Sequence, residues 1–411
     1  MPDATPADRI ASQQSQSPRF LLLYALAVAG GAIAYVPFLT ILLPVRVEAL
    51  AGDASVDWLA YAAMAGALAA SFANIGFGWA SDLTRALPWG RRGWIATGLM
   101  VSSLLLANMS VVTHLPVLIA MLVAWQFALN MMLAPLAAWA GDTVPDHQKG
   151  LLGGLLASAP AMGALVGALI TIPGLASPDT RLILVAVLVI LCVAPALLFG
   201  KPAGFPELVD PVASTAVRRP SQKRGVVVRM WLARLLVQIA EAALFAYLYL
   251  WLRSIAPGFS DNEAAQIFFG VLLVTVPVAL WVGRWADRVD RPIFPLTIAA
   301  GVAAAALLSM AIAPNLVMAL AAYAVFGLSA HVFLSLHSAQ TLRVLPRPER
   351  RGRDLGLFNL TNTVPSPIMS VLTLTLVPVF GFDGLFVLLS GLASLACLCL
   401  LSAGRIRHHG K

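Results

Sequence analysis

Residues 78–82 read Gly-Trp-Ala-Ser-Asp at the end of a long apolar segment, and residues 90–92 read Gly-Arg-Arg before the next one. Residues 283–288 read Gly-Arg-Trp-Ala-Asp-Arg at the corresponding place in the second half, 205 residues after the first copy. Val-Pro and Lys-Gly at 144–150 are matched by Leu-Pro and Arg-Gly at 345–352, at nearly the same offset. Two matches at one offset indicate an internal duplication, which is typical of transporters that bind their solute between two membrane halves.

Apolar segments occupy most of the chain on either side of these loops. Of the 411 residues, 60% are hydrophobic and 11% are charged, whereas a soluble domain has roughly 45–50% and 25%. A helix needs about 20 apolar residues to cross a bilayer. We therefore predict an all-α membrane protein with twelve transmembrane helices, at residues 20–43, 58–80, 93–112, 115–139, 151–173, 182–199, 231–252, 264–284, 293–312, 315–337, 355–378 and 383–402.

Polar segments divide these spans into two sets of six. The predicted organisation is an N-terminal tail (1–19), a six-helix bundle (20–199), a linker (200–230), a second six-helix bundle (231–402) and a C-terminal tail (403–411). The first tail lacks a basic start followed by an apolar run and a cleavage site, so we do not expect a removable signal peptide.

The basic residues predict the orientation of the chain. Cytoplasmic loops of membrane proteins are enriched in Lys and Arg. With the N-terminus inside, 24 of the 27 Lys and Arg residues lie on the inner side, and only Arg46, Arg181 and Arg253 lie outside. We therefore expect a multi-pass protein of the plasma (inner) membrane with both termini in the cytoplasm. The net charge of +8 is then a property of membrane loops and does not indicate nucleic-acid binding.

The loop after the second span resembles a known signature. Gly-x-x-x-Asp followed by Gly-Arg-Arg is similar to the loop motif of the major facilitator superfamily. The pairs at 81–82 and 84–85, together with residues 89–92, resemble the branch that contains glycoside–cation symporters and sucrose carriers. The resemblance implies two pseudo-symmetric six-helix bundles, alternating access around a central cavity, and a sugar or glycoside as the solute.

The same resemblance implies a gating role for the loop residues. Asp82 would accept hydrogen bonds from the N–H groups that begin span 11, where the helix dipole favours an anion. Asp287 would do the same at the start of span 5. The alternative is that these charges only set the topology. The candidate gating residues are Gly78, Asp82, Arg85, Gly90, Arg91, Arg92, Gly283, Asp287, Arg288 and Arg291.

One acid lies deep in a predicted span. Glu241 is about ten residues, or about 15 Å, into span 7, where an ionised carboxylate costs about 2.5–3.5 kcal/mol or more. It must therefore face a wet cavity, pair with a cation or hold a proton. Arg234 and Gln238 lie on the same helix face, and Gln238 is placed to bridge the other two. We predict that these residues carry proton coupling or bind the substrate. The alternative is a structural Glu241 that bonds a neighbouring span.

Other polar residues within the spans are weaker candidates for substrate contact, since polar side chains also join membrane helices. In span 4, amides would bind hydroxyl groups and an indole would stack on a sugar. The candidates are Trp125, Gln126, Asn130, His331, Asn359, Asn362, Tyr35 and Asn74.

Enzyme motifs are not found in the sequence, which contains no phosphate-binding loop, zinc motif or nucleophile elbow. We therefore expect no cofactor and no metal. We predict a secondary carrier for a small-molecule substrate, coupled to a proton, embedded in a lipid bilayer and monomeric. Two alternatives stay open: an efflux carrier for drugs or hydrophobic metabolites, and a transporter-like sensor or assembly factor that moves nothing.

Overall fold

The structure is a computed structural model. It describes residues 15–145, 148–156, 158–204, 224–289, 293–344, 361 and 364–408. The described residues are almost entirely helical and contain no strand. This confirms the predicted all-α class.

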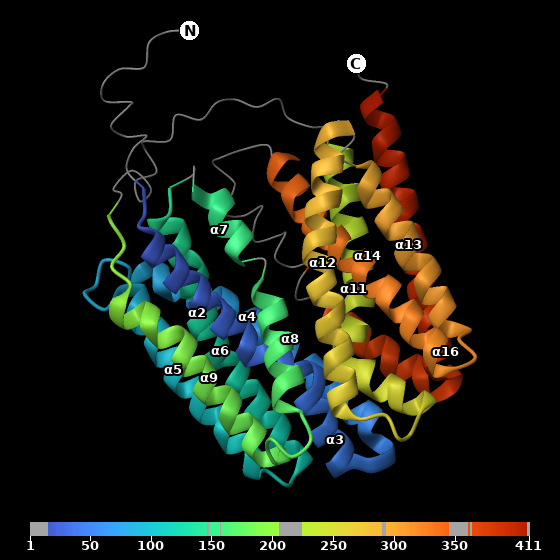
Figure 1. Ribbon diagram of the computed structural model, residues 1–411, viewed down its shortest axis with the longest axis horizontal. Helices are drawn as coiled ribbons and strands as arrows, with labels where there is room; N and C mark the ends of the chain where they lie inside the picture. Colours follow the sequence, from blue (N-terminus) through green and yellow to red (C-terminus); the bar gives the residue numbers. More distant parts are fainter. Residues whose placement is uncertain are drawn as a thin grey trace.

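The N-terminal half is built from consecutive helices with short connections (Figure 1). They are α2 (Pro18–Pro37), η1 (Phe38–Leu42), α3 (Leu43–Ala51), η2 (Gly52–Ala54), α4 (Ser55–Leu83), α5 (Gly90–Asn108), η3 (Met109–Val111), α6 (Leu115–Thr143), α7 (Lys149–Leu156), α8 (Ala159–Ile170) and α9 (Pro178–Phe199). The C-terminal half contains α11 (Arg224–Ile255), α12 (Asp261–Val289), α13 (Phe294–Ala311), α14 (Leu316–Val344) and α16 (Pro365–His408).

Nine helical runs among the described residues are long and apolar enough to cross a membrane. Two of these runs each cover two predicted spans. The run 18–83 contains Gly52 with φ 55°, and α16 contains Gly381 with φ 66°. Both glycines adopt a left-handed conformation that other residues avoid, so the chain leaves the helical path there and the next span begins.

The fifth predicted span is not a single helix. Residues 151–173 were expected to form one span, but they form α7 and the 12-residue α8. Pro160 lies in the first turn of α8. Proline lacks the N–H that a helix interior requires, although it is tolerated in a first turn. A single continuous span over these residues was therefore wrong.

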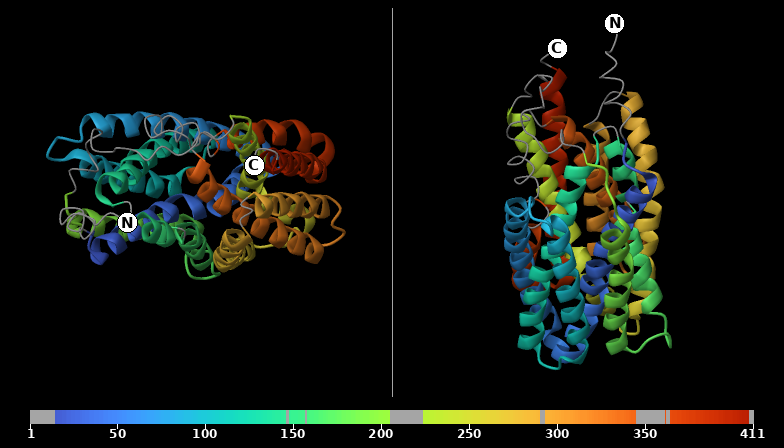
Figure 2. Two further views of the ribbon diagram at one scale, coloured as in Figure 1. Left: turned by 90° about the horizontal axis from the view of Figure 1, so that it is seen from above. Right: turned by 90° about the vertical axis from the view of Figure 1, so that its left-hand side faces the viewer.

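The two halves lie side by side and touch through few elements. Seen from above, the first half occupies one end of an elongated outline and the second half the other (Figure 2). The main contacts between them join α8 to α12, α4 to α16, and α11 to η1. The halves approach most closely at the end opposite the chain termini (Figure 1). We call the two ends of the molecule the termini side and the opposite side.

Glycines allow helices within the first half to approach closely. A Cβ atom on Gly98 of α5 would lie 2.5 Å from the backbone nitrogen of Met132 in α6. A Cβ atom on Gly163 of α8 would lie 2.8 Å from the carbonyl oxygen of Ala32 in α2. Small residues of this kind are the usual means of packing membrane helices.

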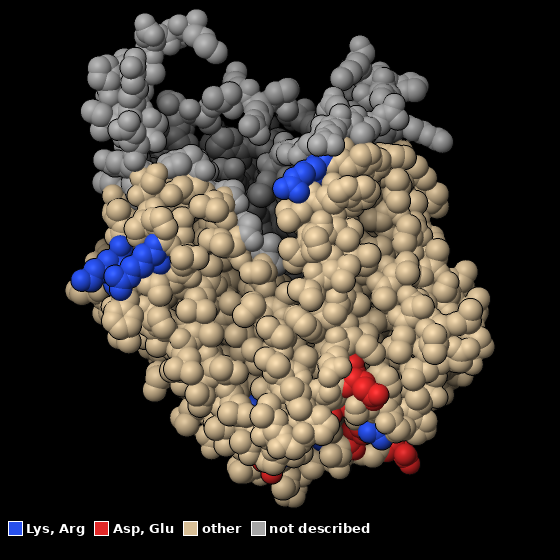
Figure 3. Space-filling model, viewed as in Figure 1, with Lys and Arg blue, Asp and Glu red and all other residues tan. Residues whose placement is uncertain are grey.

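The surface agrees with a membrane location. A broad uncharged belt surrounds the middle of the molecule on the face shown, and acidic side chains gather on the opposite side (Figure 3). Large apolar residues are exposed on the molecule, among them Phe72, Ile75 and Trp281. Exposed apolar area on this scale is unusual for a soluble protein, and it supports the predicted multi-pass membrane protein.

Candidate functional site

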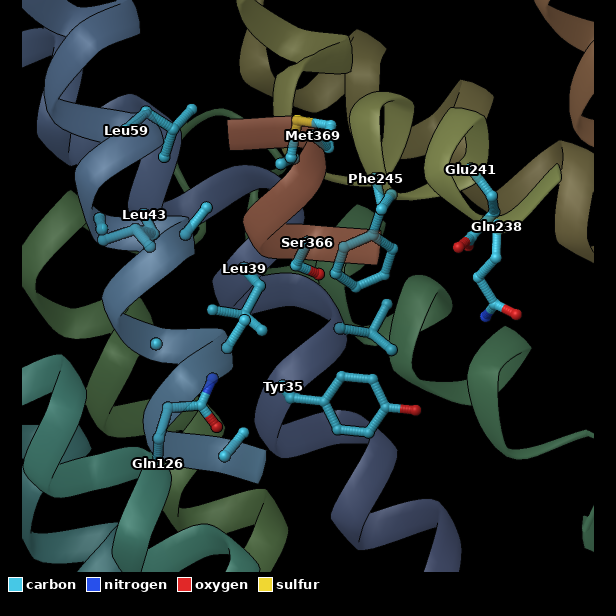
Figure 4. Close-up of a pocket in the computed structure, with 18 of the residues that line it drawn as sticks. Tyr35, Leu39, Leu43, Leu59, Gln126, Gln238, Glu241, Phe245, Ser366 and Met369 are labelled. Carbon is cyan, nitrogen blue, oxygen red and sulfur yellow. The ribbon is translucent and has the colours of Figure 1, made fainter. Parts of the chain in front are cut away.

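A cavity of about 510 Å³ lies between the two halves. The first half contributes α2, η1, α3, α4, α6 and α8, and the second contributes α11, α12, α14 and α16. Most of the lining is apolar. The polar lining residues are Tyr35, Gln126, Gln238, Glu241, His331 and Ser366 (Figure 4). Glu241 is the single acid, and no Lys or Arg is found among the lining residues.

The path of the first span places four of its residues in this cavity, namely Tyr35, Val36, Leu39 and Leu43. Pro37 ends α2, and the π-helical segment η1 follows directly. Proline cannot donate the next helical hydrogen bond, and single π turns of this kind often mark functional sites. Tyr35, Leu39 and Leu43, spaced four residues apart across this segment, all line the cavity. The change to a π-helix was not predicted from the sequence.

Glu241 faces a histidine from another helix. Its Oε1 lies 3.9 Å from Nε2 of His331, and the Glu241 side chain is 20% exposed. Nδ1 of His331 lies 2.8 Å from the carbonyl oxygen of Gly327. A carbonyl can only accept, so Nδ1 carries the proton. Nε2 is then the ring nitrogen that faces the Glu241 carboxyl group.

The expected bridge between Arg234 and Glu241 is not formed. Arg234 donates to Oγ1 of Thr361 at 3.1 Å and to the carbonyl of Leu334 at 3.2 Å. Gln238 faces the cavity, and its buried Oε1 has no hydrogen-bond partner in the described part of the chain. Arg234 is directed instead into the interior of the second half, so placing it with the cavity residues was wrong.

Of the three candidates in span 4, only Gln126 lines the cavity. Trp125 is fully buried and packs edge-to-face on Phe38, with ring centroids 4.9 Å apart. Neighbouring residues on a helix point about 100° apart, so Gln126 and Trp125 face different surroundings. The prediction that Trp125 stacks on a substrate is wrong in this structure.

Asn130 and Asn74 also lie away from the cavity lining. Nδ2 of Asn74 donates to Oδ1 of Asn130 at 3.3 Å, and Nδ2 of Asn130 donates to the carbonyl of Gln126 at 2.9 Å. The first bond joins α4 to α6 and the second lies within α6, so the asparagine pair holds two helices together, which is the structural alternative for polar residues in spans. Asn359 and Asn362 lie outside the described residues.

Arg91 is the centre of an ion cluster on the termini side. It bonds Asp82 at 2.7 Å, Asp142 at 2.5 Å and the hydroxyl of Ser81 at 2.9 Å. Arg85 lies 3.8 Å from Asp142. Asp142 lies in the last turn of α6. It was not among the predicted gating residues, although its position just after a long apolar segment could have indicated it. The cluster joins the ends of α4 and α6 to the start of α5.

The structure also describes three further candidate gating residues of the first loop. Arg92 donates to the carbonyl of Leu197 and lies over the ring of Trp139, 5.8 Å from its centroid. Gly90, with φ 32°, begins α5. No described atom outside its own helix lies within 4 Å of a Cβ built on Gly78.

The second loop is only partly described. A Cβ on Gly283 would lie 3.6 Å from Leu336, an ordinary contact between α12 and α14. The side chains of Asp287 and Arg288, and the whole of Arg291, lie outside the described residues, as does the expected partner of Asp82 at residues 355–360.

Two ion-pair clusters join the halves on the opposite side. Arg181 of α9 pairs with Asp261 of α12, and the neighbouring Asn262 donates to Oγ1 of Thr171 at 3.0 Å. These residues form the first cluster. It connects the end of α8 and the start of α9 to the start of α12.

The second cluster lies between α3 and α11. Glu48 accepts from the hydroxyl of Tyr249 at 2.8 Å and lies 3.3 Å from Nε of Arg253. Arg46 pairs with Asp179 at 2.8 Å within the first half. All three basic residues predicted for this side are therefore ion-paired, and two of the pairs connect the halves.

The first cluster yields a test of how the opposite side closes. Asp261→Asn should weaken the Arg181–Asp261 pair, which contributes about 1 kcal/mol. A loss of this size changes the equilibrium between the closed and open states of the opposite side roughly fivefold. The readout is a cysteine that replaces Leu39 in a chain whose three native cysteines are replaced by serine. With Asp261→Asn, this cysteine should react about fivefold faster than in the parent with a membrane-impermeant thiol reagent added from the opposite side.

Asp179→Asn is the matched control for this experiment. It removes the same charge on the same side, but its partner Arg46 belongs to the same half. Its labelling rate should equal that of the parent. Equal rates for both variants would show that the Arg181–Asp261 pair does not hold the halves together.

One protein-family model is similar to part of the chain. The family model described as Major Facilitator Superfamily matches residues 230–411. No match was found among curated proteins.

Several solved structures share the fold. A bacterial homologue of the human lysosomal transporter Spinster, in an inward-facing and occupied conformation, has a TM-score of 0.71 at 14% identity, covering 98% of each chain. A mutant of the nucleoside transporter NupG has a TM-score of 0.67 at 14% identity, covering 93% of this chain and 99% of its own. The human organic anion transporter MFSD10 has a TM-score of 0.65 at 17% identity, covering 94% and 100%.

These similarities show the major facilitator fold over nearly the whole chain. The family match adds that residues 230–411, the second half of the chain, are similar to the Major Facilitator Superfamily model. The sugar-transporting branch stays a prediction, because none of these findings identifies it.

Proposed function

We propose that this chain is a secondary active transporter that exchanges a small, mostly apolar organic cation for a proton by alternating access. The observation that carries the proposal is Glu241, which faces His331 and is the one acid among the described residues that line a mainly apolar cavity between the halves. A fold shared with transporters supports alternating access around such a cavity.

Glu241 suits this exchange because its charge is costly at membrane depth. The carboxylate is stabilised when it holds a proton, shares one with His331, or pairs with a cationic solute. One carboxylate cannot hold a proton and neutralise a cation at the same time. The two ligands therefore compete, and competition at one site is sufficient to couple their movements in opposite directions.

The lining favours an apolar solute over the sugar that the loop resemblance implies. A sugar carries hydroxyl groups on every face, and each one that is buried without a partner costs about 1–3 kcal/mol. The cavity instead offers mainly Leu, Ala, Phe, Val and Met side chains. This supports the alternative of an efflux carrier for drugs or hydrophobic metabolites. The enrichment of Lys and Arg on the termini side supports placing that side on the cytoplasmic face of the inner membrane.

The proposal can be tested with purified protein in liposomes that are acidic inside. We expect the permanent cation ethidium to accumulate, and accumulation to stop when an ionophore removes the pH gradient. Protein-free liposomes give the background. Accumulation of sucrose instead would support the sugar carrier. Binding of ethidium without flux would contradict transport and support a sensor.

A further inference from the structure

We propose that the cavity recognises its solute at two ends: Glu241 binds an amine at one end, and the side-chain amide of Gln126 binds a neutral hydrogen-bonding group at the other. This inference rests on the proposed function and deepens it. It names the substrate class as an organic monocation that carries a carboxamide, hydroxyl or carbonyl group away from its amine.

The two polar ends belong to different halves of the molecule. Gln126 extends from α6 in the first half, and Glu241 extends from α11 in the second. In Figure 4 they lie at opposite ends of the cavity, with Tyr35, Leu39 and Phe245 between them. A solute that reaches both ends would therefore contact both halves at once.

Gln126 is largely buried, and its side chain reaches the cavity. The residue is 7% exposed. The bond from Asn130 goes to its backbone carbonyl, and its side-chain amide has no hydrogen bond to any other residue that the structure describes. Because this amide lines the cavity, a solute is the available partner.

The space beside this amide is kept open by a glycine. A Cβ on Gly66 of α4 would lie 3.5 Å from Nε2 of Gln126 and 3.5 Å from Leu122. A larger side chain at this position would occupy the place where a ligand group meets the amide. Gly66 itself lines the cavity, so the approach to Gln126 is from the cavity.

The other end favours a cation. Among the described residues that line the cavity, Glu241 is the one carboxyl group, and His331 is the one titratable base that faces it. Phe245 lies one helical turn further on and also lines the cavity. An aromatic face beside a carboxylate is a suitable environment for an alkylammonium group.

The test compares two probes that differ only at the far end. The probes are 4-phenylbutylamine and the same amine with a carboxamide at the para position of the ring. Equilibrium binding is measured on the full-length protein in detergent. One added hydrogen bond in a buried site is expected to make the carboxamide bind about tenfold more tightly.

Gln126→Leu should remove this preference, so that the two probes bind within twofold of each other. Gln126→Met keeps the length of the side chain and serves as a second variant if the first folds poorly. Glu241→Gln is the matched change at the other end, and it should weaken both probes about equally while keeping the preference for the carboxamide.

Two results would overturn the inference: a preference that is unchanged in both Gln126 variants, or no binding of either amine to the unmodified protein. Failure of the proposed function gives a different result. If both probes bind as expected but neither moves in liposomes, the recognition stands and the transport does not.

Discussion

Glu241→Gln is expected to abolish accumulation of ethidium in liposomes that are acidic inside. One pH unit stores about 1.4 kcal/mol per proton, so one-for-one exchange supports about a tenfold concentration ratio in the parent. Glutamine has nearly the same shape, but it cannot bind and release a proton. The concentration ratio should fall to about one, measured as internal against external ethidium at steady state.

Glu263→Gln is the matched control for this charge change. Glu263 also lies in the second half, but it accepts from the backbone N–H of Ser260 at 2.8 Å on the opposite side and does not line the cavity. This variant should accumulate ethidium like the parent. A Glu241→Gln protein that still accumulates the cation with unchanged pH dependence would remove Glu241 from coupling. A protein that no longer folds would favour the structural alternative.

Arg91→Ala is expected to lower the stability of the first half strongly. Arg91 is 7% exposed and bonds both Asp82 and Asp142. Removing one partner of a buried ion pair costs about 3–5 kcal/mol, because the remaining charge is left unpaired. We expect about 3 kcal/mol here, since the Asp82 side chain is 64% exposed. The measurement is the thermal unfolding midpoint in detergent, with the yield of folded protein as a second readout.

Arg92→Ala is the neighbouring control. Arg92 is exposed and bonds a single backbone carbonyl, that of Leu197, so its removal should cost less than about 1 kcal/mol. Arg91→Lys should rescue little, because lysine lacks the planar fork that reaches two carboxylates. Equal midpoints for Arg91→Ala and Arg92→Ala would show that the cluster contributes no stability.

Much of the fold follows from local sequence patterns. Apolar runs of about 20 residues predict spans because an unpaired backbone group cannot remain in lipid. The repeated loops at 78–92 and 283–291 predict two halves. Breaks inside a run were harder to predict. Pro160 divides the fifth span and Pro37 precedes a π-helical segment, whereas Pro135 and Pro195 lie within continuous helices. The effect of a proline depends on which neighbouring groups replace its missing hydrogen bond.

The candidate site could be predicted only in part. The depth of Glu241 follows from counting residues, and the structure places it in a cavity with His331. Its partner could not be predicted, because His331 comes from another helix 90 residues away, and spacing along one helix carries no information about its neighbours. The same limit explains why Gln238 was expected to bridge to Arg234, which bonds Thr361 and Leu334 instead.

The sequence by itself determined the membrane class, the duplication, the charge asymmetry and the depth of one acid, because these depend on composition and on order along the chain. Only the tertiary structure decided that Gln126 faces the cavity while Trp125 packs on Phe38, that Asp142 shares Arg91, and that Arg181 and Arg253 pair across the halves. These facts depend on how helices distant in sequence are rotated and packed. In lipid that rotation is decided by small contacts between neighbouring helices, since the hydrophobic effect does not distinguish one apolar face from another.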